Sequence, residues 1–345
     1  MGLVALVFYN LKINKGFNEN YISKNQTTAI NGIFVILVFM CHFVTYVKAG
    51  RYDALYKLVN STLNSLIVVS FLFYSGYGIM CSIKSKGTSY VRSMPAKRIF
   101  KVWYHFALAI LLFAVVNIIL DRNITVKNIL LSFIGAETIG NSSWYIITTI
   151  VLYIFTFVAF LIFRKNHILG ALTVFALTIG FIIVMRSNGA SVPWYKTVTA
   201  YPLGMLFALS KDKIEKLMKN NLVLYIGSLV VFGTGLVVFN KLFTSAQYIQ
   251  YNIQSFFFAG VLILITMKVS VGNKILAFFG KYTFEIYILQ RIPMLLLRNV
   301  IHGSYYYLVA CFVSTLILAV LFRMLTDFLD TKVFKISKKP AMIKA

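Results

Sequence analysis

Ten apolar runs of near-spanning length constrain the fold of this 345-residue chain more than any other feature. A helix crosses a hydrocarbon core of about 30 Å with about 20 predominantly apolar residues, so runs of this length favour transmembrane helices. The sixth run is short and opens at Tyr201-Pro202, and its helix either begins earlier, near Pro193, or is broken. The sequence predicts helices at about 28–47, 62–83, 103–120, 142–163, 168–185, 198–209, 222–239, 253–271, 279–297 and 304–325.

Composition agrees with a membrane-embedded chain. Hydrophobic residues make up 59% of the sequence and the mean hydropathy is +0.81. Only 12% of the residues are charged, against about a quarter in soluble domains. The expected fold class is therefore all-α, a polytopic membrane protein with about ten transmembrane helices.

Basic residues far outnumber acidic ones, with 34 Lys and Arg against 9 Asp and Glu and a net charge of +25. Such an excess can indicate nucleic-acid binding, but these residues lie in short loops between apolar runs, so no nucleic-acid partner is expected. With a cytoplasmic N-terminus, 24 of the basic residues fall on the inside and 10 on the outside. The positive-inside rule therefore predicts that both termini are cytoplasmic.

One membrane domain is expected over residues 28–327, because no loop is long enough for a separate domain and no period of 20–50 residues repeats. Residues 1–27 begin with an apolar stretch that is too short to span and lacks a basic n-region, which predicts an interfacial segment rather than a signal peptide. Residues 328–345 form a basic tail, either a topology signal or a contact with anionic membrane lipid. Neither a disulfide nor a metal site is expected, since the cysteines fall in separate apolar runs, at Cys41, Cys81 and Cys311.

A polar face crosses the first apolar run. Asn31 and His42 are eleven residues apart, so a helix returns them to nearly the same face, about 16.5 Å apart along its axis. In the predicted orientation Asn31 lies near the inner end of the helix and His42 nearer the outer end. A histidine at membrane depth is costly unless it is solvated or paired, which makes His42 a functional candidate.

Five further stretches carry short motifs. In chain order they are FLFYSGYGIM from Phe71, MPAKRIFKVWYHF from Met94, SSWYIITTIVLY from Ser142, YPLGM from Tyr201 and FFGKYTFEIYILQRIPM from Phe278. Together with the Asn31–His42 helix they resemble the acyltransferase-3 family of bacterial membrane O-acyltransferases, over about Thr28 to Asp327. The chain carries Asn31 where members usually have Arg or Lys, and Gln290 where many have a second histidine.

The resemblance implies transfer of an acyl group, usually acetyl, from cytoplasmic acyl-CoA to a hydroxyl of an extracytoplasmic or lipid-linked saccharide. It implies a multi-pass protein of the bacterial cytoplasmic membrane that modifies a cell-envelope polysaccharide, with acyl-CoA as a cosubstrate and no bound cofactor. Some members carry an added extracytoplasmic hydrolase-like domain. Without one, this chain is expected to deliver the acyl group itself or to hand it to a separate extracytoplasmic partner protein.

The residues of the resemblance can be given chemical roles. Esterifying a hydroxyl requires a base, and neutral imidazole suits the task, so His42 is the expected catalytic residue. Gln290 or Asn31 would bind the thioester oxygen as it becomes anionic. Arg98 and Lys101 fall on the family pattern for acyl-CoA binding, and cations of this kind bind phosphates. Positive-inside bias alone also explains such charges in what is expected to be a cytoplasmic loop, residues 84–101.

Three further polar residues stand in the ninth run: Glu285, Tyr287 and Arg291. They are expected to line a polar pocket, and the alternative for the charged ones is an ion pair with another helix. Glu285 and Arg291 are about 120° away from a common helix face, so no pair between them is expected. Pro293 is expected to kink this helix and to open backbone groups near the site.

Trp144 and Tyr145 stand at the outer start of the fourth run, near the level of His42. The resemblance favours an acceptor-side role for them, whereas aromatic belts place Trp and Tyr there in any membrane protein. His105 stands at the inner start of the third run, where acyl-CoA could approach or where the imidazole is simply solvated. His167 and His302 fall in loops and receive no role.

A transporter or flippase for a polysaccharide or glycolipid is the alternative function, because many helices with polar residues at membrane depth fit that class too. No inverted repeat relates the halves of the sequence, which favours the acyltransferase. Cleavage of a thioester would distinguish the two, since a transporter has no reason to consume acyl-CoA.

Overall fold

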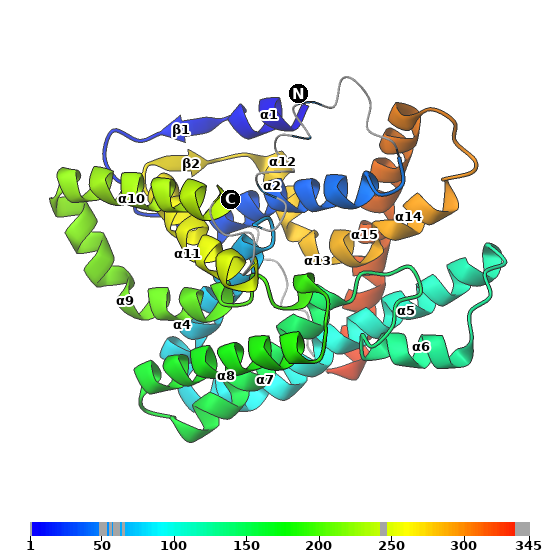
Figure 1. Ribbon diagram of the computed structural model, residues 1–345, viewed down its shortest axis with the longest axis horizontal. Helices are drawn as coiled ribbons and strands as arrows, with labels where there is room; N and C mark the ends of the chain where they lie inside the picture. The colour runs from blue at the N-terminus through cyan, green and yellow to red at the C-terminus, as the bar shows by residue number, and fades with distance from the viewer. Residues whose placement is uncertain are drawn as a thin grey trace.

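The apolar runs fold into a bundle of helices, with a small strand pair at one edge (Figure 1). The computed structural model describes residues 2–47, 66–241 and 247–334, together with residues 54, 57 and 63. The basic tail beyond residue 334 and most of the first predicted outer loop lie outside these ranges. The described helices are α1 Gly2–Phe8, α2 Lys24–Phe43, α4 Val69–Met94, α5 Lys101–Ile119, α6 Val126–Phe133, α7 Trp144–Ile162, α8 His167–Ser187, α9 Ala200–Asn220, α10 Leu222–Lys241, α11 Gln247–Thr266, α12 Lys274–Lys281, α13 Thr283–Leu289, α14 Arg291–Leu296 and α15 Ser304–Val333.

The all-α polytopic fold class is confirmed. Among the described residues, seven helical segments are long and apolar enough to cross a membrane, and one of them, Val69–Ile119, contains both α4 and α5. The number of crossings and the side of the termini stay predictions. α9 follows the short 3₁₀ helix Val192–Trp194, begins at Ala200 and continues to Asn220, well beyond the predicted end at 209.

The predicted ninth helix, 279–297, is wrong as a single element. The chain forms three short helices there, α12, α13 and α14, with breaks at Tyr282 and Gln290. Pro293 lies in the first turn of α14, where a missing N–H costs no helical hydrogen bond, so the proline fits the start of a helix rather than kinking one.

The expected loop at 84–101 is also helical. α4 continues to Met94, with non-helical backbone at Gly87 (φ 57°, ψ −143°), and the π-helix Pro95–Phe100 then leads directly into α5. A positive φ is available to glycine without steric cost, which is why the turn falls there. The basic residues of this segment are therefore held on ordered backbone.

An antiparallel strand pair was not expected from the sequence. Strand β1, Leu11–Ile13, pairs with β2, Val269–Val271, so the predicted helix 253–271 ends early, at Thr266. The pair ties the segment before α2 to the segment before α12. α15 in turn runs to Val333, beyond the predicted end at 325.

Two glycine contacts bring α2 against α12. A side chain at Gly32 would overlap the carbonyl oxygen of Leu276, and one at Gly280 would overlap the carbonyl oxygen of Thr28. Backbones can approach this closely only where Cβ is absent, which is a common way of packing membrane helices. This crossing sets the position of α2 relative to α13 and α14, which follow α12.

A second pair of glycines joins α4 to α9. A Cβ at Gly76 would overlap the carbonyl oxygen of Tyr201, and a Cβ at Gly204 would overlap the carbonyl oxygen of Phe73. The FYSGY stretch and the YPLGM stretch therefore form one close helix crossing. Two motifs that are well separated in the sequence share a single packing role.

Replacing Gly204 by valine is expected to destabilise the protein by more than about 3 kcal/mol, because the new side chain overlaps rigid backbone of α4 and forces the helices apart. Thermal unfolding of the detergent-purified protein measures this effect. The matched control is Gly227→Val on α10, where an added Cβ meets no atom within 4 Å. Equal unfolding temperatures for the two variants would contradict a backbone contact at Gly204.

Candidate active site

His42 lies in the last turn of α2, and its imidazole contacts two elements that are distant in the sequence. Arg291 Nε, at the start of α14, donates a hydrogen bond to His42 Nδ1 over 3.2 Å. The Ser142 hydroxyl, just before α7, lies 3.4 Å from the same nitrogen. His42 is nevertheless only partly buried, as are Ser142 and Arg291. The imidazole is therefore held by two neighbours and keeps part of its surface exposed.

These contacts determine which imidazole nitrogen is basic. A guanidinium group has donors and no acceptor, so the nitrogen that receives a hydrogen bond from Arg291 must carry a lone pair. Neutral His42 then carries its proton on Nε2 and its lone pair on Nδ1. The hydroxyl of Ser142 faces the same lone pair, which becomes available as a general base when Arg291 releases it.

Aromatic rings enclose the imidazole from the side of α13 and α7. The ring of Tyr287 lies 6.2 Å from that of His42, and Tyr145 lies 5.1 Å from Tyr287. Trp144 packs edge-on against Tyr145, with 5.8 Å between ring centroids. The structure thus brings Tyr287 and Arg291 to His42, places Tyr145 one ring further away and places Trp144 beyond Tyr145.

Gln290 and Asn31 were predicted to bind the anionic oxygen. Gln290 lies in the break between α13 and α14 and is fully buried. Its Nε2 donates a hydrogen bond to the carbonyl of Tyr287 over 3.2 Å. Gln290 Oε1 and Asn31 Oδ1 are both buried and have no hydrogen-bond partner within the described ranges. No hydrogen bond between described residues joins either amide to His42, and their roles stay predictions.

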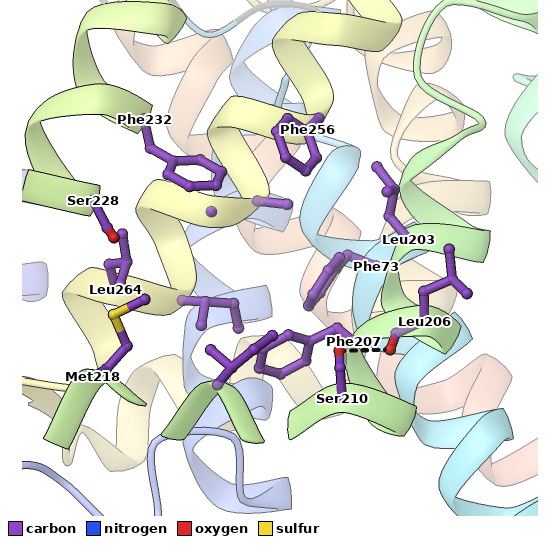
Figure 2. A pocket seen from close by; sticks show the side chains of 14 residues that line it. Phe73, Leu203, Leu206, Phe207, Ser210, Met218, Ser228, Phe232, Phe256 and Leu264 are labelled. Carbon is purple, nitrogen blue, oxygen red and sulfur yellow. Dashed lines mark hydrogen bonds between the residues drawn. The ribbon is translucent and has the colours of Figure 1, made fainter. Parts of the chain in front are cut away.

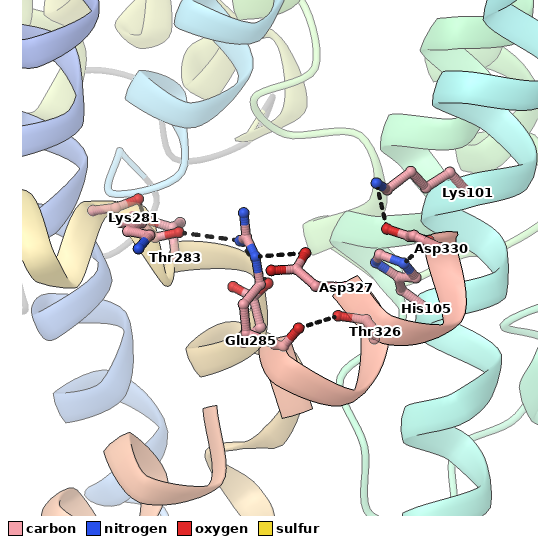
Figure 3. A network of polar contacts seen from close by, with 10 residues as sticks. Lys101, His105, Lys281, Thr283, Glu285, Thr326, Asp327 and Asp330 are labelled. Atoms are coloured by element: carbon pink, nitrogen blue, oxygen red, sulfur yellow. Dashed lines mark hydrogen bonds and ion pairs between the residues drawn. The ribbon is translucent and has the colours of Figure 1, made fainter. Parts of the chain in front are cut away.

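Glu285 makes an ion pair with another helix, the alternative to lining a pocket. Its carboxylate is 2% exposed and accepts a hydrogen bond from Arg323 of α15 over 2.8 Å (Figure 3). Arg323 Nε also lies 3.5 Å from the exposed carboxylate of Asp327. The pair joins the broken segment α12–α14 to the last helix.

Lys101 and His105 both contact Asp330, which lies on α15, the helix that also carries Arg323. Lys101 Nζ lies 2.5 Å from Asp330, and His105 Nε2 lies 3.0 Å from the other oxygen of that carboxylate (Figure 3). Asp330 is buried, at 5% exposure. One carboxylate and two basic side chains therefore meet where α15 lies beside the start of α5. The predicted contact of Lys101 with acyl-CoA would therefore involve an already paired ammonium group.

A basic cavity adjoins this cluster. Its volume is about 410 Å³, and basic, hydroxyl and aromatic side chains line it: Lys86, Ser89, Tyr90, Ser93, Lys97, Arg98, Lys101 and Phe334. Arg98 Nε donates to the Tyr90 hydroxyl over 3.1 Å, and both Lys86 and Arg98 lie 5.9 Å from the Tyr90 ring. Cations around an aromatic ring suit a ligand with phosphates and a flat base.

Polar side chains run along one face of α7 from His42 toward this cavity. Ser142, Tyr145, Thr149, Tyr153 and Thr156 are spaced three or four residues apart, so they share a helix face. The row is about 21 Å long, from 14 residues at about 1.5 Å each.

The far end of this row lies against α4 and α9. The Tyr153 hydroxyl lies 3.0 Å from Ser75 Oγ, and the Thr156 hydroxyl lies 2.8 Å from that of Tyr201. α7 also packs against the π-helix Pro95–Phe100, which carries Arg98. α7 therefore connects the imidazole and the basic cavity through protein rather than through lipid.

A separate cavity between α4, α9, α10 and α11 is almost entirely apolar (Figure 2). Its volume is about 310 Å³, and its lining includes Phe73, Phe207, Phe232 and Phe256. Ser210 is one of its few polar members, and that hydroxyl already donates to the Leu206 carbonyl over 2.9 Å. No titratable side chain lines this cavity, so it cannot supply an acid or a base.

Sequence reasoning missed three residues of these sites. Ser142 opens the SSWYIITTIVLY motif, but its contact with His42 was not predicted. Arg323 and Asp330 fall in α15, where charged residues continuing an apolar run were the available signal. Among the described residues, no cluster of three or more His, Cys, Asp or Glu side chains could hold a metal ion.

The fold and these contacts define a polytopic membrane protein with a histidine-centred site and a basic cavity joined by one helix. The chain belongs to the acyltransferase-3 family, whose acyltransferase domain matches residues 28–324. The protein is therefore a membrane acyltransferase. No curated protein and no solved structure shows significant similarity to the chain.

Proposed function

We propose that this protein is an O-acetyltransferase that moves an acetyl group from acyl-CoA to a hydroxyl of a saccharide outside the membrane or linked to lipid. The observation that carries the proposal is the partly exposed imidazole of His42, whose Nδ1 lone pair faces a hydroxyl group. An acyltransfer reaction needs such a base to remove the acceptor's proton. We place the protein in a bacterial cytoplasmic membrane, as a multi-pass protein.

The donor site in this proposal is the basic cavity around Arg98. Its four cationic side chains, Lys86, Lys97, Arg98 and Lys101, offer charge-assisted hydrogen bonds to phosphates, and Tyr90 and Phe334 offer flat surfaces to a nucleotide base. The predicted orientation puts this cavity on the cytoplasmic side, where acyl-CoA is made. The thioester arm would then follow the hydroxyl row of α7 toward His42.

The reaction ends at His42. Its Nδ1 takes the proton of the attacking hydroxyl while the oxygen bonds to the thioester carbonyl carbon, and the tetrahedral intermediate then expels the CoA thiolate, which takes a proton in turn. Arg291 stands beside the imidazole and offers positive charge to the carbonyl oxygen as it becomes anionic. Gln290 and Asn31, with unpartnered buried oxygens, are the further polar groups of the pocket.

The acceptor is expected to approach from the other side, past Trp144 and Tyr145. Stacked and edge-on aromatic rings of this kind present the flat apolar faces that sugar rings pack against. We propose that the chain delivers the acetyl group either directly to the saccharide or to a separate extracytoplasmic partner protein.

Consumption of radiolabelled acetyl-CoA by the purified protein tests this function. We expect release of free CoA thiol together with label in an added saccharide fraction. A transporter or flippase has no step that breaks the thioester, so intact acetyl-CoA after incubation with protein and acceptor would refute the acetyltransferase and favour transport.

Replacing Arg98 by alanine is expected to raise the KM for acetyl-CoA about 10- to 100-fold with little change in kcat, because one charge-assisted contact to a phosphate contributes about 1.5–3 kcal/mol to binding. Steady-state kinetics with varied acetyl-CoA measures the effect. The matched control is Arg92→Ala, an exposed arginine of the same segment that does not line the cavity. An unchanged KM in the Arg98 variant would place the donor elsewhere.

A further inference from the structure

We propose that Ser142 carries the acyl group as a covalent ester between the two half-reactions, with His42 as its base. The proposal rests on the acetyltransferase function above and specifies how the site performs it. Its basis is one juxtaposition: a serine hydroxyl 3.4 Å from the lone-pair nitrogen of a partly exposed imidazole.

The pair has the geometry of an activated nucleophile. A serine is a weak nucleophile alone and becomes reactive when a neighbouring base accepts its proton. Arg291 donates to His42 Nδ1, which fixes the lone pair on the nitrogen that Ser142 faces. Because Arg291 shares this one lone pair with Ser142, its N–H has to turn from Nδ1 to the carbonyl oxygen as that oxygen becomes anionic, and Nδ1 is then open to the serine proton.

The start of α7 adds a second feature to the same place. Ser142 comes two residues before Trp144, the first residue of this 19-residue helix, and the intervening Ser143 makes no side-chain capping bond. The first N–H groups of a helix lack intrahelical partners and carry partial positive charge. An acyl group on Ser142 would place its carbonyl oxygen near these donors, which favour an oxyanion.

The proposed reaction has two half-reactions, and His42 returns the proton that it takes in each of them. Ser142 Oγ attacks the thioester carbonyl carbon while His42 Nδ1 takes the hydroxyl proton, and the C–S bond breaks to give the Ser142 ester and a CoA thiolate that recovers the proton from His42. In the second half, the acceptor hydroxyl attacks the ester carbonyl, His42 takes its proton, and the C–O bond to Ser142 breaks. The proton then returns from His42 to Ser142 Oγ.

A covalent carrier also fits the arrangement of the two substrates. Ser142 stands at the end of the hydroxyl row that leads from the basic cavity and next to the aromatic pair Trp144 and Tyr145. CoA can leave toward one side before the acceptor enters from the other. Donor and acceptor therefore need not occupy the crowded surroundings of the imidazole at the same time.

Rapid-quench labelling of the full chain in detergent tests the proposal. The protein is mixed with radiolabelled acetyl-CoA without acceptor, quenched in acid, digested and analysed by peptide mass spectrometry. We expect one acetyl group on Ser142 in the unaltered protein and none in Ser142→Ala, whose transfer to acceptor should fall by about 100-fold or more. Ser142→Cys should accumulate a thioester that hydroxylamine releases.

Two controls separate chemistry from folding. Ser187→Ala removes an exposed serine at the end of α8, whose hydroxyl bonds only to the local carbonyl of Val184, and should leave labelling and transfer unchanged. The Ser142 variants should keep the unfolding temperature of the unaltered protein. Labelled Ser142 that passes its acetyl group to added acceptor would support the carrier.

Transfer that persists at the unaltered rate in Ser142→Ala would overturn the carrier while leaving the acetyltransferase intact, since His42 would then act directly on the acceptor. Acetyl label on another side chain would overturn it equally. By contrast, absence of thioester cleavage by the unaltered, folded protein would contradict the proposed function itself, so the two failures are distinguishable.

Discussion

His42→Ala should lower acetyl transfer by about 10²–10⁴-fold, the range that a general base contributes to a reaction. The variant loses the one nitrogen that faces Ser142 and receives the hydrogen bond of Arg291. Because the imidazole is partly exposed, its loss should cost little folding stability. Release of CoA thiol and labelling of acceptor, measured on purified protein at matched concentration, give the result.

His302→Ala is the matched control, since His302 is exposed and lies between α14 and α15. It should retain full activity. Undiminished acetylation by His42→Ala would refute the assignment of the base, whereas an equal loss of activity and of folded protein would show that His42 is structural.

Arg323→Met should destabilise the protein by about 3–5 kcal/mol, because it leaves the carboxylate of Glu285 without its cation inside the bundle. Glu285 is 2% exposed, so water cannot replace the lost partner. Methionine preserves much of the apolar stem, which isolates the effect of charge. Thermal or denaturant unfolding in detergent measures the change.

The double variant Glu285→Gln with Arg323→Met should recover much of this stability, since no buried charge remains unpaired. Lys332→Met, which removes an exposed cation from the same helix, serves as the control and should change stability by less than about 1 kcal/mol. Arg323→Met with the stability of the control would show that Glu285 is solvated or protonated in the folded protein.

The sequence located most helices because the rule behind them is local. In the membrane, a run of about 20 apolar residues must make its backbone hydrogen bonds within itself, which favours a helix. Segments such as Lys24–Phe43 and Trp144–Ile162 can therefore be predicted from their own residues alone. The prediction was wrong where the backbone of a segment forms its hydrogen bonds with a distant element instead of within a helix. The end of the predicted helix 253–271 forms strand β2 instead, because it pairs with β1, which lies more than 250 residues earlier in the chain.

The same division applies to the candidate site. Depth in the membrane and one motif singled out His42 without any structure. The contact of Ser142 with His42 spans 100 residues, and that of Arg291 with His42 spans 249. Contacts between residues so far apart in the sequence depend on which helices cross and where. The positions of the apolar runs alone do not predict these crossings.

By itself, then, the sequence determined a helical membrane protein and singled out His42 as a candidate, since hydrophobicity and backbone hydrogen bonding act over a single turn or a single span. Only the tertiary structure decided which groups meet that imidazole, that Glu285 pairs with Arg323, and that Asp330 holds both Lys101 and His105. The physical reason is that close approach of backbones, at glycines such as Gly32 and Gly280, sets which faces of distant helices come together.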